Sequence, residues 1–177
     1  ANYEKIHYPF IPKFYGTVEY NHIDCLIIEF INGRTLDECQ FDGYNENDII
    51  QIIFELLLIV DYFHDNNFLI RDMKPKNLMI TKQKEIVMID FDRVIDKPIQ
   101  TQSHDIQNIF EAPEVKTDEL YSKQSDIYSL AKVIEFILNK VNPKMTISEI
   151  NDIIIKCFQD KAEKRPSIKE IICDFFS

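Results

Sequence analysis

The longest apolar stretch of this chain, residues 49–63, constrains its fold most strongly. Gln51, Glu55 and Asp61 interrupt it, so it is too short and too charged to cross a bilayer. Its apolar residues crowd more than one face of a helix, which is typical of an element that is covered on several sides. The pattern therefore predicts a long central helix.

Capping residues and turns divide the remaining chain into short elements. Asn47 and Asp48 can cap the central helix, which is expected to end near His64, before a turn at residues 65–67. The other expected elements are a poor strand at 10–18 that contains Pro12 and Gly16, a strand at 26–31, strands at 77–81 and 86–89, a long loop at 92–111, a helix at 123–138, and two helices opened by capping boxes at Thr146–Glu149 and Ser167–Glu170.

Length and composition favour one globular domain. A chain of 177 residues with 45% hydrophobic content can bury a substantial core. Its formal net charge of −10 argues against nucleic-acid binding, which requires a positive face. The first residues lead into no apolar segment of the signal-peptide type, and the four cysteines include no Cys-x-x-Cys pair. We expect a cytoplasmic protein with reduced thiols that binds neither nucleic acid nor membrane.

Two short polar motifs carry the chemistry. Residues 70–77 contain Asp72, Lys74 and Asn77, and residues 89–92 contain Asp90. Together they supply two carboxylates, a lysine and a side-chain amide on neighbouring loops. Phosphoryl transfer from ATP needs such a set, because one group orients the hydroxyl, one neutralises phosphate and two hold magnesium. The pair of motifs therefore favours phosphoryl transfer.

In order and spacing these motifs are similar to the catalytic loop and the magnesium loop of protein kinases. Ala112–Glu114 resembles the motif that closes the family's activation segment, and Ser125–Leu130 resembles the helix that braces its catalytic loop. Taken singly, each piece could be an ordinary turn or helix start. The resemblance implies an α+β, protein kinase-like fold, with a β-strand remnant of the amino-terminal lobe and the hinge at 1–31 and a mainly helical carboxy-terminal lobe at 32–177.

The resemblance implies a role for each polar group of the two motifs. Asp72 matches the base that accepts the hydroxyl proton, and Lys74 matches the residue that contacts the transferred phosphate. The Asp-x-Lys-Pro-x-Asn wording is of the serine/threonine type. Asn77 and Asp90 match the two magnesium ligands, and hard oxygen donors of this kind suit Mg²⁺.

The resemblance also implies a nucleotide site and a set of supporting residues. Ile28 would be the gatekeeper, the backbone of Glu29 and Ile31 would hydrogen-bond adenine, and Met79 would pack beneath the ring. The supporting residues are Asp126, which would brace the catalytic loop, Arg165, which would pair with Glu114, Phe91, which would pack against Ile70, and Arg71, which would read a phosphate on Thr101 or Ser103 of the activation segment.

Several departures from the family pattern bear on activity. The chain has only three glycines, so it contains no glycine-rich phosphate loop. The strand lysine of the family and its glutamate partner would lie upstream of Ala1. Asp92 stands where the magnesium loop usually has glycine, and Gln107 stands where a threonine usually bridges the catalytic aspartate and lysine. Aspartate tolerates a positive φ better than most residues do.

The sequence therefore predicts a serine/threonine-type protein kinase domain, truncated at its amino end, that uses ATP and Mg²⁺ on a protein substrate. A pseudokinase or scaffold that keeps the lobe for protein binding is the alternative, favoured by Asp92, Gln107 and the missing lobe. A small-molecule kinase of related fold is a third option, weakened by Lys74-Pro75 and the Ala112–Glu114 closure. Substrate, pathway and oligomeric state are left open.

Overall fold

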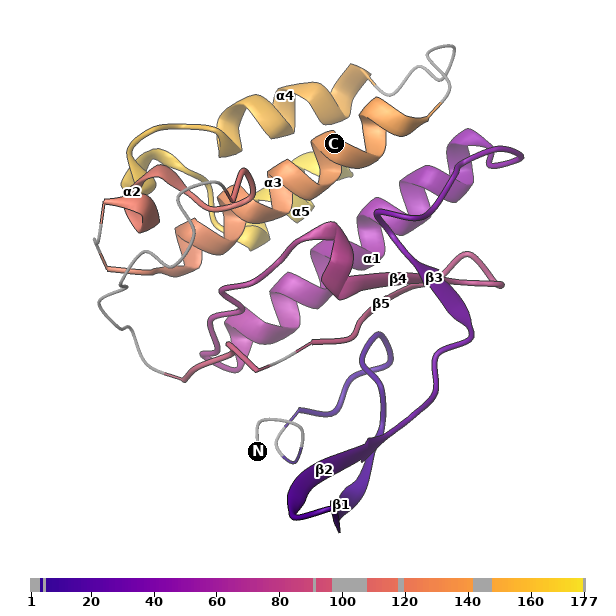
Figure 1. Ribbon diagram of the computed structural model, residues 1–177. Coiled ribbons are helices and arrows are strands. Elements are labelled where there is room, and N and C mark those ends of the chain that lie inside the picture. Colours follow the sequence, from indigo (N-terminus) through magenta and orange to yellow (C-terminus); the bar gives the residue numbers. More distant parts are fainter. Residues whose placement is uncertain are drawn as a thin grey trace.

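The computed structural model describes residues 4, 6–90, 92–96, 108–117, 120–141 and 148–176. Within these ranges a helical body lies beside two small antiparallel sheets (Figure 1). The strands are β1 (Phe14–Tyr20), β2 (Ile23–Ile28), β3 (Gly33–Thr35), β4 (Leu78–Thr81) and β5 (Ile86–Met88). The helices are α1 (Glu46–Asp65), α2 (Pro113–Lys116), α3 (Lys123–Lys140), α4 (Ser148–Cys157) and α5 (Ile168–Phe175), with 3₁₀ turns η2 (Pro75–Asn77) and η3 (Ala162–Lys164).

Helix α1 is the central element that the apolar stretch predicts. It packs against α3 and α5 on one side and β5 on the other (Figure 1). Most of its apolar residues are almost fully buried, which agrees with their spread over several faces. The predicted cap was wrong by two residues. Asn45 is the N-cap: its side chain accepts from the Asp48 backbone, and Asp48 accepts in return from the Asn45 backbone at 2.8 Å.

The second helix of the core, α3, extends over the whole range predicted for it. It begins after Ser122, which exchanges capping contacts with Ser125. Helices α4 and α5 contact α3 and α1 respectively, and also each other. The Ser167–Glu170 capping box opens α5 as predicted. The Thr146 half of the other predicted box lies outside the described residues.

The sheet β3–β4–β5 joins the central helix to the loop of 70–77. The backbone N–H of Ile86 on β5 donates to Glu55 Oε2 of α1 at 2.8 Å, which fixes the sheet on the helix. Burial raises the pKa of Glu55 above its usual value. At Gly33 on β3 a Cβ atom would lie 2.3 Å from the Ile80 carbonyl oxygen, so only glycine allows β3 to pair this closely with β4.

The hairpin β1–β2 was only half predicted. The run at 10–18 does contain a strand, but the strand starts after Pro12, at Phe14, and continues to Tyr20. Gly16 lies at a register shift with φ +147°, so it marks a bulge and does not end the strand. The strand expected at 26–31 begins earlier, at Ile23, and ends at Ile28.

The described elements confirm the α+β fold class. Strands 78–81 and 86–88 occur where the sequence predicted them. No helix in the described ranges is long and apolar enough to cross a membrane. Most of the long loop at 92–111, with Thr101, Ser103 and Gln107, lies outside the described residues.

Candidate functional site

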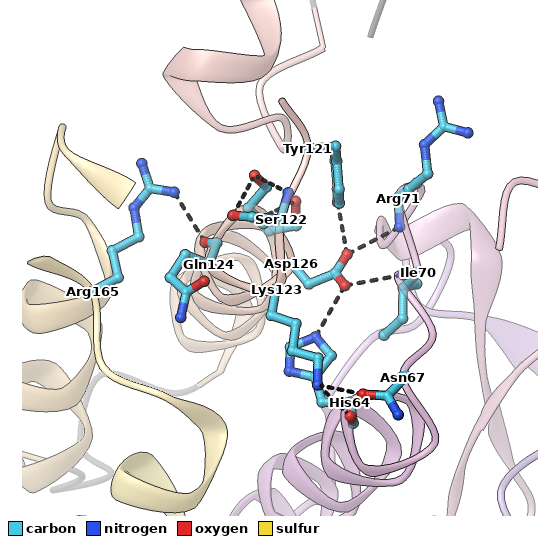
Figure 2. Close-up of polar contacts among 12 residues, drawn as sticks. His64, Asn67, Ile70, Arg71, Tyr121, Ser122, Lys123, Gln124, Asp126 and Arg165 are labelled. Atoms are coloured by element: carbon cyan, nitrogen blue, oxygen red, sulfur yellow. Dashed lines mark hydrogen bonds and ion pairs between the residues drawn. The ribbon is translucent and has the colours of Figure 1, made fainter. Parts of the chain in front are cut away.

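The carboxylate of Asp126 on α3 is fully buried at the centre of the site (Figure 2). Its Oδ2 accepts from the backbone N–H of Ile70 at 3.0 Å and lies 3.0 Å from His64 Nε2. Its Oδ1 accepts from the backbone N–H of Arg71 at 3.0 Å and from the Tyr121 hydroxyl at 2.7 Å. Burial, reinforced by the charge of Asp126, raises the pKa of Tyr121 well above its ordinary value, so its hydroxyl stays protonated.

Arg71 is held in a conformation that non-glycine residues adopt rarely, with φ +69°. Its backbone bond to Asp126 compensates for this strain at the start of the 70–77 loop. Its guanidinium carbon lies 5.9 Å from the centre of the Tyr121 ring, and Nη1 lies 3.5 Å from the carbonyl oxygen of Arg93. Its buried Nε has no hydrogen-bond partner among the described residues. The strained turn therefore fixes the direction of the loop that follows.

The next residues of the loop, Asp72, Lys74 and Asn77, form one connected polar group. Lys74 Nζ lies 2.9 Å from Asp72 Oδ1 and 2.7 Å from Oδ2. Asn77 Nδ2 donates to the Asp72 backbone carbonyl at 2.9 Å and to Oδ2 at 3.0 Å. Because its amide nitrogen is turned to Asp72, Asn77 keeps Oδ1 as an acceptor, and no described residue donates to that atom. Asp72 and Asn77 are largely buried, whereas the Lys74 side chain is about one-third exposed.

A backbone hydrogen bond places Asp90 beside the 70–77 loop. The N–H of Ile89 donates to the Asn77 carbonyl at 2.9 Å, which continues the β4–β5 ladder and brings Asp90 beside the end of the loop. No direct contact joins the Asp90 side chain to Asp72 or Asn77 among the described residues. Asp90 Oδ1 instead accepts from the backbone N–H of Asp92 at 3.1 Å. Phe91 lies outside the described residues.

Asp92 needs no unusual backbone at the position where the family has glycine. It is not among the described residues with a positive φ. Aspartate therefore replaces glycine at this position without adopting a positive φ.

Glu114 and Arg165 form a buried bidentate ion pair. Arg165 Nη1 lies 2.7 Å from Glu114 Oε1, and Nη2 lies 2.8 Å from Oε2. Ser125 Oγ also donates to Oε1 at 2.8 Å, and Arg165 donates to the carbonyl of Gln124 (Figure 2). Burial alone would raise the pKa of Glu114, but the hydrogen bonds from Arg165 and Ser125 outweigh it and lower that pKa. The pair ties α2 and the segment before α5 to the start of α3.

The residues expected around adenine lie on β2, on the segment that follows it, and on β4. Ile28 ends β2, and Glu29 and Ile31 lie on the segment that leads to β3. The N–H of Glu29 donates to the Lys13 carbonyl at 2.8 Å, so only its carbonyl is left for a ligand. Met79 lies half-buried on β4. No hydrogen bond connects Ile28, Glu29 or Ile31 to Met79 among the described residues.

Sequence reasoning missed three side chains that contact the buried carboxylates of Asp126 and Glu114. His64 and Tyr121 contact Asp126, and Ser125 contacts Glu114. His64 comes from the last turn of α1, 62 residues before its partner. Its only signal in the sequence is its place at the end of the predicted central helix.

The sequence of this chain is similar to known proteins. Residues 2–149 match the protein kinase domain. The chain is 29% identical over 193 residues to the dual specificity protein kinase zak2 of Dictyostelium discoideum. It is 26% identical over 162 residues to the calcium/calmodulin-dependent protein kinase cmkA of Emericella nidulans, and 30% identical over 136 residues to the mitosis inhibitor protein kinase SWE1 of Candida albicans.

These similarities cover most of this chain but a minor part of each relative. They include 96%, 87% and 71% of the chain, against 29%, 39% and 11% of zak2, cmkA and SWE1. The match to the kinase domain extends from the hairpin β1–β2 into α4 and includes the 70–77 loop, Glu114 and Asp126. The chain belongs to the protein kinase family.

Proposed function

We propose that this chain transfers the γ-phosphoryl group of Mg-ATP to serine or threonine hydroxyls of a protein substrate. The observation that carries the proposal is the polar group of the catalytic loop, residues 70–77. There the Asp72 carboxylate is contacted by both Lys74 and Asn77. The same loop is anchored to buried Asp126 by two backbone hydrogen bonds. A fixed carboxylate beside a partly exposed lysine suits general-base and phosphate-binding roles.

In this proposal each residue of the loop has one task. Asp72 orients the substrate hydroxyl and accepts its proton on a carboxylate oxygen. Asn77 holds that carboxylate in place through Nδ2. Lys74, which is partly exposed, exchanges its contact with Asp72 for a phosphate oxygen as the substrate binds.

The proposed cofactor is ATP with Mg²⁺, and the donor set of the site fits it. Asn77 Oδ1 and the Asp90 carboxylate are oxygen donors on adjacent backbone segments, which is what a hard cation needs. Bound Mg²⁺ would neutralise charge on the phosphates. The backbone of Glu29 and Ile31, beside Ile28, would bind adenine, with Met79 under the ring.

The proposal includes a place for the chain in the kinase architecture. Residues 1–31 would be a remnant of the amino-terminal lobe with the hinge, and residues 32–177 the carboxy-terminal lobe. Glu114, Arg165 and Asp126 would hold the lobe together. A cytoplasmic location goes with this proposal and is supported by the four free cysteines.

The role of Asp72 can be tested by phosphoryl transfer. The purified chain would be incubated with γ-labelled ATP, Mg²⁺ and a mixture of serine- and threonine-containing peptides. Asp72→Asn should reduce label transfer about 10²–10⁴-fold, the usual contribution of a general base. Asp42→Asn, which changes an exposed aspartate in the turn before α1, is the matched control and should transfer label at the unaltered rate.

Two results would contradict the proposal. Undiminished transfer by Asp72→Asn would remove the base assignment. The absence of transfer by the unaltered chain would leave the protein-binding scaffold as the better function.

A further inference from the structure

A polar pocket lies at the end of the three-stranded sheet where β4 turns into β5 (Figure 1). It has a volume of about 400 Å³, and its walls come from β3, from the end of β4 and from residues 39–44 before α1. Asn77 lies just before β4, whereas Thr81 lies at the far end of that strand. At about 3.3 Å per strand residue, the pocket is about 13 Å along β4 from Asn77. A ligand in it would therefore lie apart from the proposed site of phosphoryl transfer.

Two cations line this pocket. They are Arg34 of β3 and Lys82 after β4, and neither side chain makes an ion pair or hydrogen bond within the described part of the chain. In the sheet Arg34 is paired with Ile80, two residues before Lys82. Arg34 and Lys82 are therefore diagonal neighbours on one face, close enough for both long side chains to reach a common ligand. Two unpaired cations at this spacing repel each other, and a bound anion would offset that repulsion.

No carboxylate is among the described residues that line the pocket, although the chain has a formal net charge of −10. The nearby carboxylate of Asp48 is already paired, because Lys84 Nζ lies 2.5 Å from its Oδ2. The same Lys84 lies 4.9 Å from the centre of the Tyr44 ring, which forms part of the lining. The lining therefore carries positive charge in an acidic protein.

The uncharged polar side chains of the lining are hydrogen-bond donors. Burial raises the pKa of Tyr44 to about 12, so its hydroxyl stays protonated. Thr81 Oγ1 accepts from the backbone N–H of Glu85 at 3.2 Å, so its own hydrogen can be donated. The side-chain amides of Asn32 and Gln40 supply further N–H groups. This set of donors suits an anion with several acceptor oxygens.

A phosphate monoester fits these walls better than a carboxylate does. It carries about −1.5 to −2 charges at pH 7 and three strong acceptor oxygens. The Arg34 guanidinium can donate to two of these oxygens at once, and Lys82 supplies a second positive charge. A carboxylate carries one charge and two oxygens, so it would leave one of the two cations unpaired.

The pocket also has room for more than a phosphate group, since its volume is in the range of sites that hold larger ligands. Four of its polar residues are exposed, so a polypeptide can lie across the opening: Asn32, Arg34, Gln40 and Lys82. We propose that this pocket binds the phosphate group of a phosphorylated serine or threonine in a partner protein. Arg34 and Lys82 are the main contacts, and the Tyr44 hydroxyl is an additional donor. This binding does not depend on the proposed activity of the chain.

Fluorescence anisotropy tests the proposal with a labelled peptide that carries one phosphoserine and no other charged side chain. The phosphopeptide should bind about tenfold or more tightly than the same peptide with serine or glutamate at that position. Arg34→Gln and Lys82→Gln should each weaken its binding about tenfold or more, the loss expected when a hydrogen bond to a charged group is removed. Lys82→Arg, which keeps the charge, should retain binding.

The matched control is Lys164→Gln, which removes an exposed lysine on η3, outside the pocket. It should bind the phosphopeptide as the original chain does. Arg34 and Lys82 are exposed, so their variants should unfold at the temperature of the original chain, and circular dichroism measures this.

Three results would overturn the proposal. The first is equal affinity for the phosphorylated and the serine peptide. The second is binding that survives both Arg34→Gln and Lys82→Gln. The third is displacement of the phosphopeptide by inorganic phosphate at or below the Kd of the peptide, which would make the pocket a site for free phosphate.

The binding assay contains no ATP, so its outcome is independent of the proposed function. A chain that binds the phosphopeptide through Arg34 and Lys82 and transfers no label would support the pocket and contradict only the kinase activity. A chain that transfers label and does not bind the phosphopeptide would overturn the pocket alone.

Discussion

At the scale of single residues, the two ion pairs of the site differ in a way that suits different tasks. The Glu114–Arg165 pair is buried, bidentate and supported by Ser125, so removing one partner leaves an isolated charge in the interior. The Asp72–Lys74 pair includes a lysine side chain that is 31% exposed. Lys74 can therefore exchange its partner at low cost, whereas Arg165 cannot.

The buried Glu114–Arg165 pair should make the stability of the fold depend on pH. The pKa of Glu114 is lower in the folded protein than its ordinary value of 4.5, so the unfolded chain binds the proton more tightly. The stability from this pair is therefore fully present above pH 4.5 and is lost as the pH falls through the lower, folded-state pKa. Glu114→Gln should lower the free energy of unfolding by about 3 kcal/mol at pH 7.

Urea unfolding of both proteins from pH 7 down to pH 3.5 measures this effect. The difference in unfolding free energy between the original chain and Glu114→Gln should narrow as the solution becomes acidic. Glu163→Gln, an exposed glutamate two residues from Arg165, should change stability by less than about 0.5 kcal/mol. A difference that is constant with pH would show that the charge of Glu114 is not what stabilises the fold.

Single residues also show where sequence reasoning ends. Asp126 and Arg165 could be singled out from short motifs, because the motifs carry their own spacing. The partners of Asp126 could not. His64 contacts it only after α1 and α3 have packed together, and a contact between residues 62 positions apart leaves no local pattern. Tyr121 lies five residues before Asp126, outside the motif that singled out the aspartate.

At the scale of elements, helix starts depend on which polar side chain can reach back to the backbone. The sequence Asn45-Glu46-Asn47-Asp48 offers two asparagines, and local propensity favours both as caps. Asn45 is selected because Asp48, three residues later, closes a reciprocal capping box with it. Asn47 lies inside the first turn, where a cap has no function.

This choice can be tested with a pair of substitutions. Asn45→Ala should lower the free energy of unfolding by about 1 kcal/mol, the usual loss on removal of a cap. Asn47→Ala should leave it unchanged or raise it by a few tenths, because alanine favours helix interiors. Thermal unfolding followed by circular dichroism measures both. The reverse order of effects would return the cap to Asn47.

In the hairpin β1–β2, local sequence signals predicted a weaker strand than the structure contains. Pro12 and Gly16 lowered the expectation of a strand at 10–18. In the structure Pro12 precedes the strand, and Gly16 is absorbed by a bulge opposite β2. Pairing with a neighbouring strand outweighed local propensity, which is common in sheets.

At the scale of the whole molecule, the central helix and α3 could be predicted because their apolar patterns are long. The site could be predicted only as a set of residues. Its geometry needs α1, α3 and the β3–β4–β5 sheet to meet around the 70–77 loop, and that arrangement depends on contacts between elements distant in sequence.

The whole molecule also reports on cofactor binding, because a ligand that binds only the folded state stabilises it. Mg-ATP at one hundred times its dissociation constant should add about 2.7 kcal/mol to the free energy of unfolding. The Asp90→Asn variant should lose most of the Mg²⁺-dependent share of this stabilisation, since an amide lacks the charge that holds the cation. The Asp92→Asn variant should keep the Mg²⁺-dependent stabilisation, because the proposed ligand is the carboxylate of Asp90. Thermal-shift titrations with ATP, with and without Mg²⁺, distinguish the two variants. If Asp92→Asn lost the Mg²⁺-dependent shift and Asp90→Asn kept it, the metal ligand would be Asp92, and the proposed geometry at the end of β5 would be wrong by two residues.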